Sequence, residues 1–417
     1  MNTTLKKQLI KTRQAADQLA QLNTKQKNAL LDDYASALLK AKRSIISANK
    51  RDFSKLPKNY SLADRLLITI ERIEAITQSV RAVKKLPDPV GETLEQRKLK
   101  NGLIVKRIRV PIGVLGVIYE ARPNVTVEVT SLTLKTGNAV VLKGGSDATE
   151  SNKAFVKIVH QVLKKHKLNT AAVTMLDPKQ TKQLMQADDY IDVLIPRGSD
   201  RLIKFVRQNA TVPVIETGAG VCHTYVEKSA RLDWAVKQVV NAKTRRPSVC
   251  NAMDTLIVDK TVAKTLFKML APALAEHKVR LKADALSFPL LKKLYPEQLL
   301  KKAKPSDFGK EFLSLQASVK IVNNWQEAIE FIQKNTSGHS EAIVTDNKKV
   351  AQQFAKRIDA AAVYVNAPTS YTDGFEFGLG AEIGISTQKL HARGPMALRE
   401  LTTYKWVIEG QGQIRPV

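Results

Sequence analysis

The sequence holds only two cysteines among its 417 residues. Two thiols cannot form the disulfide framework that holds small secreted domains together, so we expect both to be reduced. The chain lacks an apolar run of the roughly 18 residues that cross a membrane. Residues 1–20 also lack the apolar stretch and small-residue cleavage site of a signal peptide. These absences predict a cytoplasmic protein with no membrane partner.

Several ligand-binding motifs are missing as well. There is no Walker A sequence and no G-x-G-x-x-G, so a dinucleotide would have to bind without the usual Rossmann fingerprint. The six histidines are scattered and show no metal-ligand spacing such as H-E-x-x-H. The sequence therefore predicts no metal site.

The net charge of +28 comes from 67 lysines and arginines against 39 acidic residues. Such a surplus suggests nucleic acid as a partner. However, the basic residues are spread along the chain, without a basic tail, zinc-finger spacing or interleaved aromatic residues. We therefore expect a solvated basic surface or one that attracts small anions, and no nucleic-acid partner.

The distribution of apolar residues predicts the fold class. Residues 1–85 show helical spacing, and two prolines in residues 86–92 end that region. From residue 111 short apolar strands alternate with helices, and the alternation begins again after Cys250. Such strands are typical of a parallel sheet covered on both faces. The sequence predicts an α/β fold with two doubly wound parallel-sheet lobes.

Three further segments are predicted to be extended. Residues 101–110, NGLIVKRIRV, begin with a turn signal and continue as a β-rich run. Residues 212–218, VPVIETG, have the composition of another strand, and residues 402–417 that of a final one.

Two strand-to-helix junctions resemble phosphate-binding sites. Each has a cation at the strand end, then glycine, then a residue that can cap the following helix. Free N–H groups at a helix amino terminus attract phosphate, although the same pattern also serves plain helix capping. The candidate residues are Lys143, Gly144 and Gly145 at the first junction and Arg197, Gly198 and Ser199 at the second.

Cys250 follows two arginines in NAKTRRPSVCN. Nearby cations lower the pKa of a thiol and activate it as a nucleophile, but a lone cysteine is more often a small buried residue. Cys222 competes for the nucleophilic role, because His223 follows it. Neighbours on a strand point to opposite faces, so this pair is not predicted to be a catalytic dyad.

Long segments of the chain are similar to those of one enzyme family. They include VPIGVLGVIYEARPNVTVEV, NAKTRRPSVCN and STQKLHARGPM, and they follow the family's order nearly from end to end. On these motifs the sequence resembles the gamma-glutamyl phosphate reductases (glutamate-5-semialdehyde dehydrogenases) of the aldehyde dehydrogenase superfamily.

The resemblance implies a domain organisation and a homo-oligomer. A cofactor domain would comprise residues 1–91 and 111–220, and a catalytic domain with Cys250 would comprise residues 221–400. Residues 92–110 and 401–417 would form a small β element for oligomerisation.

The resemblance also implies the reaction. Cys250 would attack L-glutamyl 5-phosphate, and the thioester would be reduced with NADPH to L-glutamate 5-semialdehyde, the second step of proline synthesis from glutamate. Functional coupling to glutamate 5-kinase is implied as well. Two other functions stay open: a hydrolytic NAD(P)-dependent aldehyde dehydrogenase, and a basic nucleic-acid-binding protein without catalysis.

Individual residues take roles from the same resemblance. Asn124 is an oxyanion donor or a helix cap, Lys143 lies near the adenosine ribose, and Gly198 and Ser199 lie beside the pyrophosphate. Glu216 aligns with the hydrolytic base of the superfamily, which a reductase of an acyl phosphate does not need. The candidates for binding the glutamyl group are Arg246, His391 and Arg393.

Overall fold

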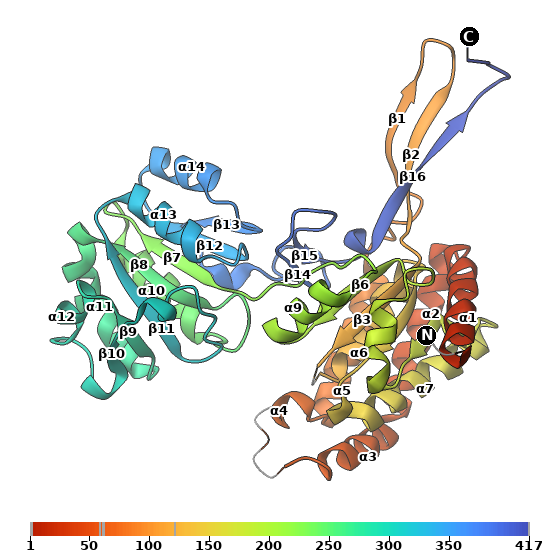
Figure 1. Cartoon of the computed structure of the whole chain (residues 1–417), viewed down its shortest axis with the longest axis horizontal. Coiled ribbons are helices and arrows are strands. Elements are labelled where there is room, and N and C mark those ends of the chain that lie inside the picture. The colour runs from red at the N-terminus through yellow and green to blue at the C-terminus, as the bar shows by residue number, and fades with distance from the viewer. Residues whose placement is uncertain (1–2, 58–59, 61–62, 121, 416–417) are drawn as a thin grey trace. The chain divides into compact units, whose positions relative to one another are not determined.

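Helices occupy the amino-terminal region, as the apolar spacing predicts. The computed structural model describes residues 3–57, 60, 63–120 and 122–415 (Figure 1). Asn23 caps the second helix through a reciprocal pair of 2.9 Å hydrogen bonds with Gln26, which satisfies two otherwise unpaired groups. The helices are α1 (Thr3–Ala20), α2 (Thr24–Lys40), α3 (Lys42–Phe53), α4 (Ala63–Leu66) and α5 (Ile70–Lys85).

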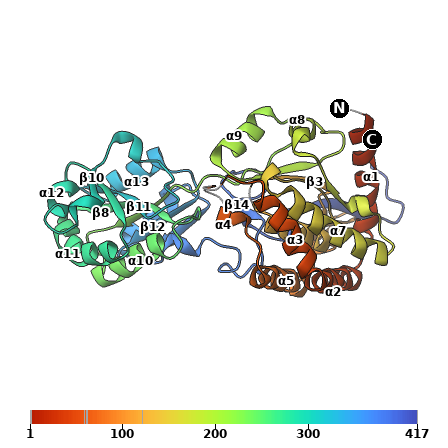
Figure 2. The same ribbon diagram turned by 90° about the horizontal axis from the view of Figure 1, so that it is seen from below.

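A four-stranded parallel sheet with the order β5-β4-β3-β6 follows these helices. Its strands are almost entirely buried, because helices cover both faces. Figure 2 shows α8 and α9 on one side of this sheet and α2, α5 and α7 on the other. The elements are β3 (Val114–Tyr119), α6 (Asn124–Lys135), β4 (Ala139–Lys143), α7 (Thr149–Lys165), β5 (Val173–Met175), α8 (Thr181–Met185), β6 (Val193–Arg197) and α9 (Asp200–Asn209).

The strand order reverses direction at β3. The chain moves from β3 to β4 and β5 on one side, and β6 then pairs with the opposite edge of β3. Ligands of open α/β sheets bind at such a switch point, outside the carboxyl ends of the strands. Lys143 and Arg197 are the last residues of β4 and β6, so both predicted phosphate junctions lie at this edge.

A second parallel sheet has seven strands in the order β10-β9-β11-β8-β7-β12-β13. On β8, Leu256 and Val258 belong to one apolar cluster and Ile257 to another, which shows that both faces are covered. The elements are β7 (Cys222–Val226), α10 (Leu232–Thr244), β8 (Met253–Asp259), α11 (Lys260–Glu276), β9 (Arg280–Ala283), α12 (Ser287–Leu291), β10 (Leu300–Lys302), β11 (Gln316–Val322), α13 (Trp325–Asn335), β12 (Ser340–Val344), α14 (Lys348–Arg357) and β13 (Ala362–Val365).

A three-stranded antiparallel sheet joins segments that are remote in the sequence. It contains β1 (Thr93–Lys98), β2 (Ile104–Pro111) and β16 (Thr402–Glu409), and β16 pairs with β2 along its whole length. A further two-stranded sheet contains β14 (Gly384–Ser386) and β15 (Gly394–Met396).

The chain divides into two compact units. The first unit contains Met1–Thr217, Leu379–Gly384 and Met396–Val417, and the second contains Gly218–Gly378 and Ile385–Pro395. The first unit therefore holds the four-stranded and three-stranded sheets, and the second holds the seven-stranded sheet with Cys250. In the part of the chain that the structure describes, no helix is both long and apolar enough to span a bilayer.

One predicted strand is wrong. Residues 212–218 do not form a strand, and they pair with β6 only through an isolated bridge between Val214 and Leu194. Pro213 lacks the N–H group that a continuous ladder needs. The sequence also gave no signal for β9 and β10, which are short and contain lysines.

Candidate active site

Cys250 lies on the turn between α10 and β8, and it is half-buried. Its main chain packs directly against Gly220, because a Cβ atom on that glycine would lie 1.7 Å from the Cys250 carbonyl oxygen. Only glycine allows two backbones to approach this closely. The candidate site is therefore at the amino ends of the parallel strands β7 and β8.

The segment that lies against Cys250 is held by its own main chain. Three successive N–H groups each donate to a side chain from a different part of the second unit. Those of Gly220, Val221 and Cys222 donate to Glu311 (2.9 Å), Ser337 (2.9 Å) and Asp254 (3.4 Å). The backbone beneath Cys250 thus has three separate anchors, and it is fixed in one position.

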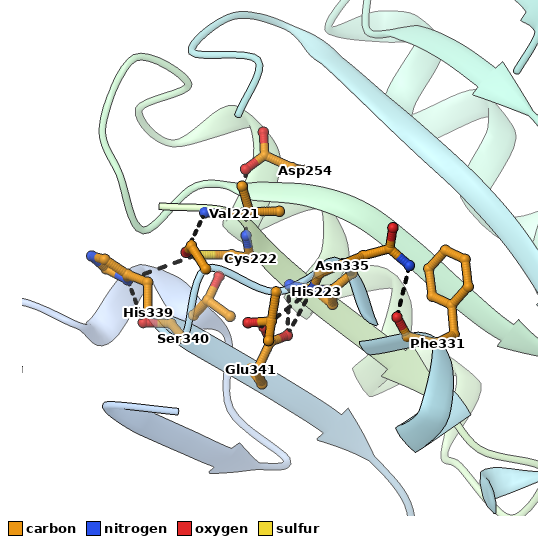
Figure 3. Close-up of polar contacts among 12 residues, drawn as sticks. Val221, Cys222, His223, Asp254, Phe331, Asn335, His339, Ser340 and Glu341 are labelled. Carbon is orange, nitrogen blue, oxygen red and sulfur yellow. Dashed lines mark hydrogen bonds and ion pairs between the residues drawn. The ribbon is translucent and has the colours of Figure 1, made fainter. Parts of the chain in front are cut away.

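Cys222 begins β7 and is fully buried. Its Sγ donates to the Cys250 carbonyl at 3.2 Å and lies 3.8 Å from His339 Nδ1, as Figure 3 shows for the histidine. Burial, followed by the neighbouring carboxylate of Asp254, raises the pKa of Cys222 well above its ordinary value. Cys222 therefore keeps its proton and is a poor nucleophile.

His223 points away from Cys222, which confirms that the two do not form a dyad. Its Nδ1 lies 2.9 Å from Glu341 Oε2, and both side chains are fully buried (Figure 3). Thr336 also donates to Glu341. This pair connects β7 with β12 behind the site.

Asn251 connects the Cys250 turn to a second loop. Its side chain donates to the carbonyls of Ser370 (3.3 Å) and Thr372 (3.0 Å), and its own carbonyl accepts from the Thr369 hydroxyl at 2.8 Å. The residue after Cys250 is therefore locked to the 369–372 turn.

Asp254, one of the three anchors of residues 220–222, also forms a buried ion pair. Lys243 Nζ lies 3.8 Å from Asp254 Oδ1 and donates to the Met253 carbonyl at 2.7 Å. Burial raises the pKa of Asp254 to about 7, although Lys243 opposes the shift. For Lys243 burial acts in the opposite direction and lowers the pKa, because the charged form of lysine is the protonated one. A buried carboxyl with such a pKa often marks a functional site, although structural pairs show it too.

The three candidates for binding the glutamyl group all lie in the second unit. Arg246 and His391 are exposed. Arg393 forms an ion pair with Asp359, with 2.7 Å between Nη2 and Oδ1. His391 has a φ of 66°, so its loop turns sharply there.

The first predicted phosphate junction has a half-buried cation. Burial lowers the pKa of Lys143, while Glu120 and Asp147 oppose the shift. A Cβ atom at Gly144 would lie 2.3 Å from Asn152 Nδ2, so glycine is required for close packing here. Gly145 precedes a short 3₁₀ helix that leads into α7.

The second junction already holds a negatively charged group. The Glu120 carboxylate accepts from the Ser199 N–H at 2.8 Å, and the Ser199 hydroxyl caps α9. A Cβ atom at Gly198 would lie 2.5 Å from the same carboxylate. The amino terminus of α9 is thus an anion-binding position, and Glu120 occupies it.

Asn124 is the first residue of α6, and its side chain donates to Glu128 at 2.8 Å. The helix cap is Pro123, which makes no side-chain hydrogen bond to the helix. Asn124 therefore does not cap the helix, and the alternative interpretation of this residue is wrong. Its role as an oxyanion donor stays a prediction.

The sequence did not predict a cavity of about 530 Å³ beside α7. Val156, Met175 and Leu176 provide apolar walls, and Lys153 and Lys157 contribute positive charge. It is in the same unit as the first phosphate junction, at the helix that this junction begins. The only signal was the spacing of lysines on one face of α7.

The sequence did not predict which side chains support the Cys250 segment. Glu311, His339 and Asp254 come from separate segments, and nothing in a single segment shows that they meet. Among the described residues, no group of His, Cys, Asp and Glu side chains is arranged to hold a metal ion.

Comparison with known proteins first defines the class. The sequence profile of the aldehyde dehydrogenase family matches residues 2–290 and 317–407. An acetylating aldehyde dehydrogenase from Geobacillus thermoglucosidasius shares the fold, with a TM-score of 0.68 and 16% identity over 99% of this chain and 98% of that one.

Closer relatives define the branch. Gamma-glutamyl phosphate reductases of Chlorobium limicola and Bacteroides thetaiotaomicron are 51% and 47% identical to this chain, over the full length of both partners in each case. The crystal structure of a gamma-glutamyl phosphate reductase from Thermotoga maritima has a TM-score of 0.94 and 42% identity, and the match covers 99% of this chain and 100% of that chain. The chain belongs to the gamma-glutamyl phosphate reductase family.

Proposed function

We propose that this chain reduces L-glutamyl 5-phosphate to L-glutamate 5-semialdehyde with NADPH and releases inorganic phosphate. This is the second step from glutamate to proline. The observation that carries the proposal is the Cys250 turn: a half-buried thiol on a rigidly anchored backbone, in a chain whose full-length relatives are gamma-glutamyl phosphate reductases.

Cys250 is the nucleophile in this proposal. Its thiolate attacks the acyl carbon, a thioester forms, and the phosphate leaves with the bonding electrons. When bound, NADPH supplies a hydride to the acyl carbon. Collapse of the adduct on Cys250 then releases the aldehyde and restores the thiolate.

The developing oxyanion needs hydrogen-bond donors. We assign this role to the Asn124 amide, which the family resemblance suggests. A side-chain amide has two N–H donors, and the Asn124 amide uses one for Glu128. One such donor contributes about 3–4 kcal/mol to the transition state in comparable sites.

The first unit fits the phosphates of NADPH. Lys143 and Arg197 supply cations at the switch point of the sheet, and Gly144, Gly145 and Gly198 carry no side chain that would keep a phosphate from the backbone N–H groups. The Glu120 carboxylate shows that the amino terminus of α9 attracts anions, and it must leave when a phosphate binds. The cavity beside α7 combines apolar walls with lysines, which suits an adenosine that bears a phosphate.

The glutamyl group needs cations for its α-carboxylate. Arg246, His391 and Arg393 are the candidates that the second unit supplies. Arg393 is held by Asp359, so its guanidinium has a fixed direction. Arg246 is exposed and can meet an anionic substrate from solution.

The proposal extends to assembly and location. The three-stranded sheet of β1, β2 and β16 would join copies of the chain in a homo-oligomer. The enzyme would act in the cytoplasm, and glutamate 5-kinase would be functionally coupled to it, because that reaction produces the acyl phosphate.

The reverse reaction tests the proposal. Reduction of NADP⁺ by glutamate 5-semialdehyde should rise with phosphate and saturate, because phosphate must cleave the thioester.

Cys250→Ser should abolish turnover and leave NADPH binding largely intact, since a hydroxyl is a far weaker nucleophile. Glu216→Gln should lower the rate only modestly, because no water has to be activated. Strong turnover in phosphate-free buffer with glutamate as the product would instead show a hydrolytic enzyme.

A further inference from the structure

The two cysteines of this chain are neighbours in the fold. Cys222 and Cys250 are 28 residues apart in the sequence, and the Cys222 thiol lies 3.2 Å from the Cys250 carbonyl oxygen. Cys222 is fully buried, and Cys250 is only half-buried. They therefore differ in access to a substrate, and they have a direct contact.

The geometry points to Cys222 as a positioning residue for the reaction of Cys250. Its thiol donates a hydrogen bond to the carbonyl of the nucleophilic residue and so fixes the peptide from which the reactive side chain projects. The inference rests on the proposed function, in which Cys250 attacks the acyl phosphate.

The support around Cys222 is built for such a role. Its N–H donates to Asp254, and the two preceding N–H groups donate to Glu311 and Ser337. The first of these residues, Gly220, packs against the same Cys250 peptide. The Cys250 carbonyl therefore packs against the anchored backbone of Gly220, and it accepts a hydrogen bond from the Cys222 thiol.

A polar chain behind Cys222 holds the thiol itself. His339 Nδ1 lies 3.8 Å from its sulfur and 2.8 Å from Ser340 Oγ, as drawn in Figure 3. Ser340 bonds to Thr372 at 2.6 Å, and Thr372 bonds to Tyr364 at 2.7 Å. The Nε2 atom of His339 is buried and has no hydrogen-bond partner in the structure.

The chemistry of the thiol suits a permanent donor. Burial keeps Cys222 protonated well above neutral pH, because its pKa is raised. The S–H group therefore stays available while Cys250 cycles between thiolate and thioester. Cys222 takes no covalent part in the reaction.

Three substitutions separate the hydrogen bond from packing. Cys222→Ser keeps a donor, Cys222→Val has no donor and is larger by about a methyl group, and Cys222→Ala has no donor and is smaller. Val226→Ala, at the other end of β7 and also fully buried, is the matched control for loss of core packing. Steady-state kinetics, NADPH affinity and thermal unfolding are measured for all four variants.

We expect kcat to fall about tenfold or more in the Val and Ala variants, because small misplacements of a reacting group are costly. The Ser variant should stay within about threefold of the wild type, and KM and NADPH affinity should change little. Alkylation of Cys250 by uncharged iodoacetamide needs no fixed orientation, so its rate should be unchanged in every variant.

Two results would overturn the inference. One is a Val variant with the turnover of the wild type. The other is an equal loss in the Ser, Val and Ala variants that parallels a loss of thermal stability, with Val226→Ala behaving alike. Failure of the proposed function would appear separately, as full activity of Cys250→Ser.

Discussion

At the scale of single residues, small contacts give similar side chains different tasks. Cys222 and Cys250 are chemically identical, but burial and the Asp254 carboxylate keep the first protonated. Gly198 and Gly220 both lie where a Cβ atom would clash with a neighbour. The neighbour of Gly198 is the Glu120 carboxylate, and that of Gly220 is the main chain of Cys250. The environment, and not the residue type, assigns each role.

Replacement of Gly198 by valine tests the second phosphate junction. The new Cβ atom would lie 2.5 Å from the Glu120 carboxylate and 3.0 Å from Leu202, so a branched side chain fills the place where a phosphate must approach. NADPH affinity measured by calorimetry should fall by about tenfold or more.

Phe205→Ala is the control for this prediction, because Phe205 is an exposed residue on the same helix, distant from its amino terminus. Its NADPH affinity should equal that of the wild type. Equal affinity in Gly198→Val and the wild type would remove the junction from the cofactor site.

At the scale of elements, a buried histidine at the start of β12 makes the second unit sensitive to acid. His339 immediately precedes β12, and burial lowers its pKa to about 4. An unfolded histidine takes up a proton near pH 6.5, whereas the folded one stays neutral. The contribution of neutral His339 to stability is therefore complete above about pH 6.5 and is lost as the pH falls toward 4.

His339→Asn tests this pH dependence, because asparagine does not titrate and offers a polar atom near the position of Nδ1. The free energy of unfolding of the wild type should fall by about 2 kcal/mol more between pH 7 and 5 than that of the variant. Denaturant titrations at both pH values measure this difference. Parallel pH profiles for the two proteins would contradict the expectation.

Strand β16 carries exposed apolar side chains along one side. Tyr404, Trp406 and Ile408 are 44–55% exposed and alternate along the strand, so they point to the same side. We expect Trp406→Glu to lower the molar mass in sedimentation experiments, because a charge would be buried between copies.

Lys405→Glu changes the charge on the other side of β16, so it should leave the molar mass unchanged. A variant Trp406→Glu that sediments like the wild type would show that the three-stranded sheet does not join the copies.

At the scale of the whole molecule, the charge of +28 bears on the capture of substrate. Both proposed substrates are polyanions, and a basic protein attracts them over a distance that salt shortens. We expect kcat/KM for L-glutamyl 5-phosphate to fall about threefold or more when ionic strength rises from about 0.02 to 0.2 M.

Alkylation of Cys250 by iodoacetamide is the control, because the reagent is uncharged and its encounter with the protein does not depend on salt. A kcat/KM value that is independent of ionic strength would mean that the basic surface is only solvated.

Most of the architecture follows from local patterns in the amino-acid sequence. Continuous apolar strands between amphipathic helices have one stable solution, a parallel sheet covered on both faces, and both sheets have it. Local chemistry likewise predicted that Lys143 and Arg197 end strands before helices. The predicted strand at residues 212–218 is wrong, because a strand needs continuous pairing with a neighbour and Pro213 interrupts the pairing with β6.

The surroundings of Cys250 follow from long-range contacts in the folded chain. The side chains of residues 254, 311 and 337 anchor the segment 220–222 that lies against Cys250. The parallel sheet brings residues 222, 254 and 337 together because the amino ends of β7, β8 and β12 lie side by side. Periodicity encodes which face of an element is apolar, and it carries no information about which distant side chain meets a given N–H. The sequence therefore could not predict the contact between the two cysteines or the position of the Glu120 carboxylate at the start of α9.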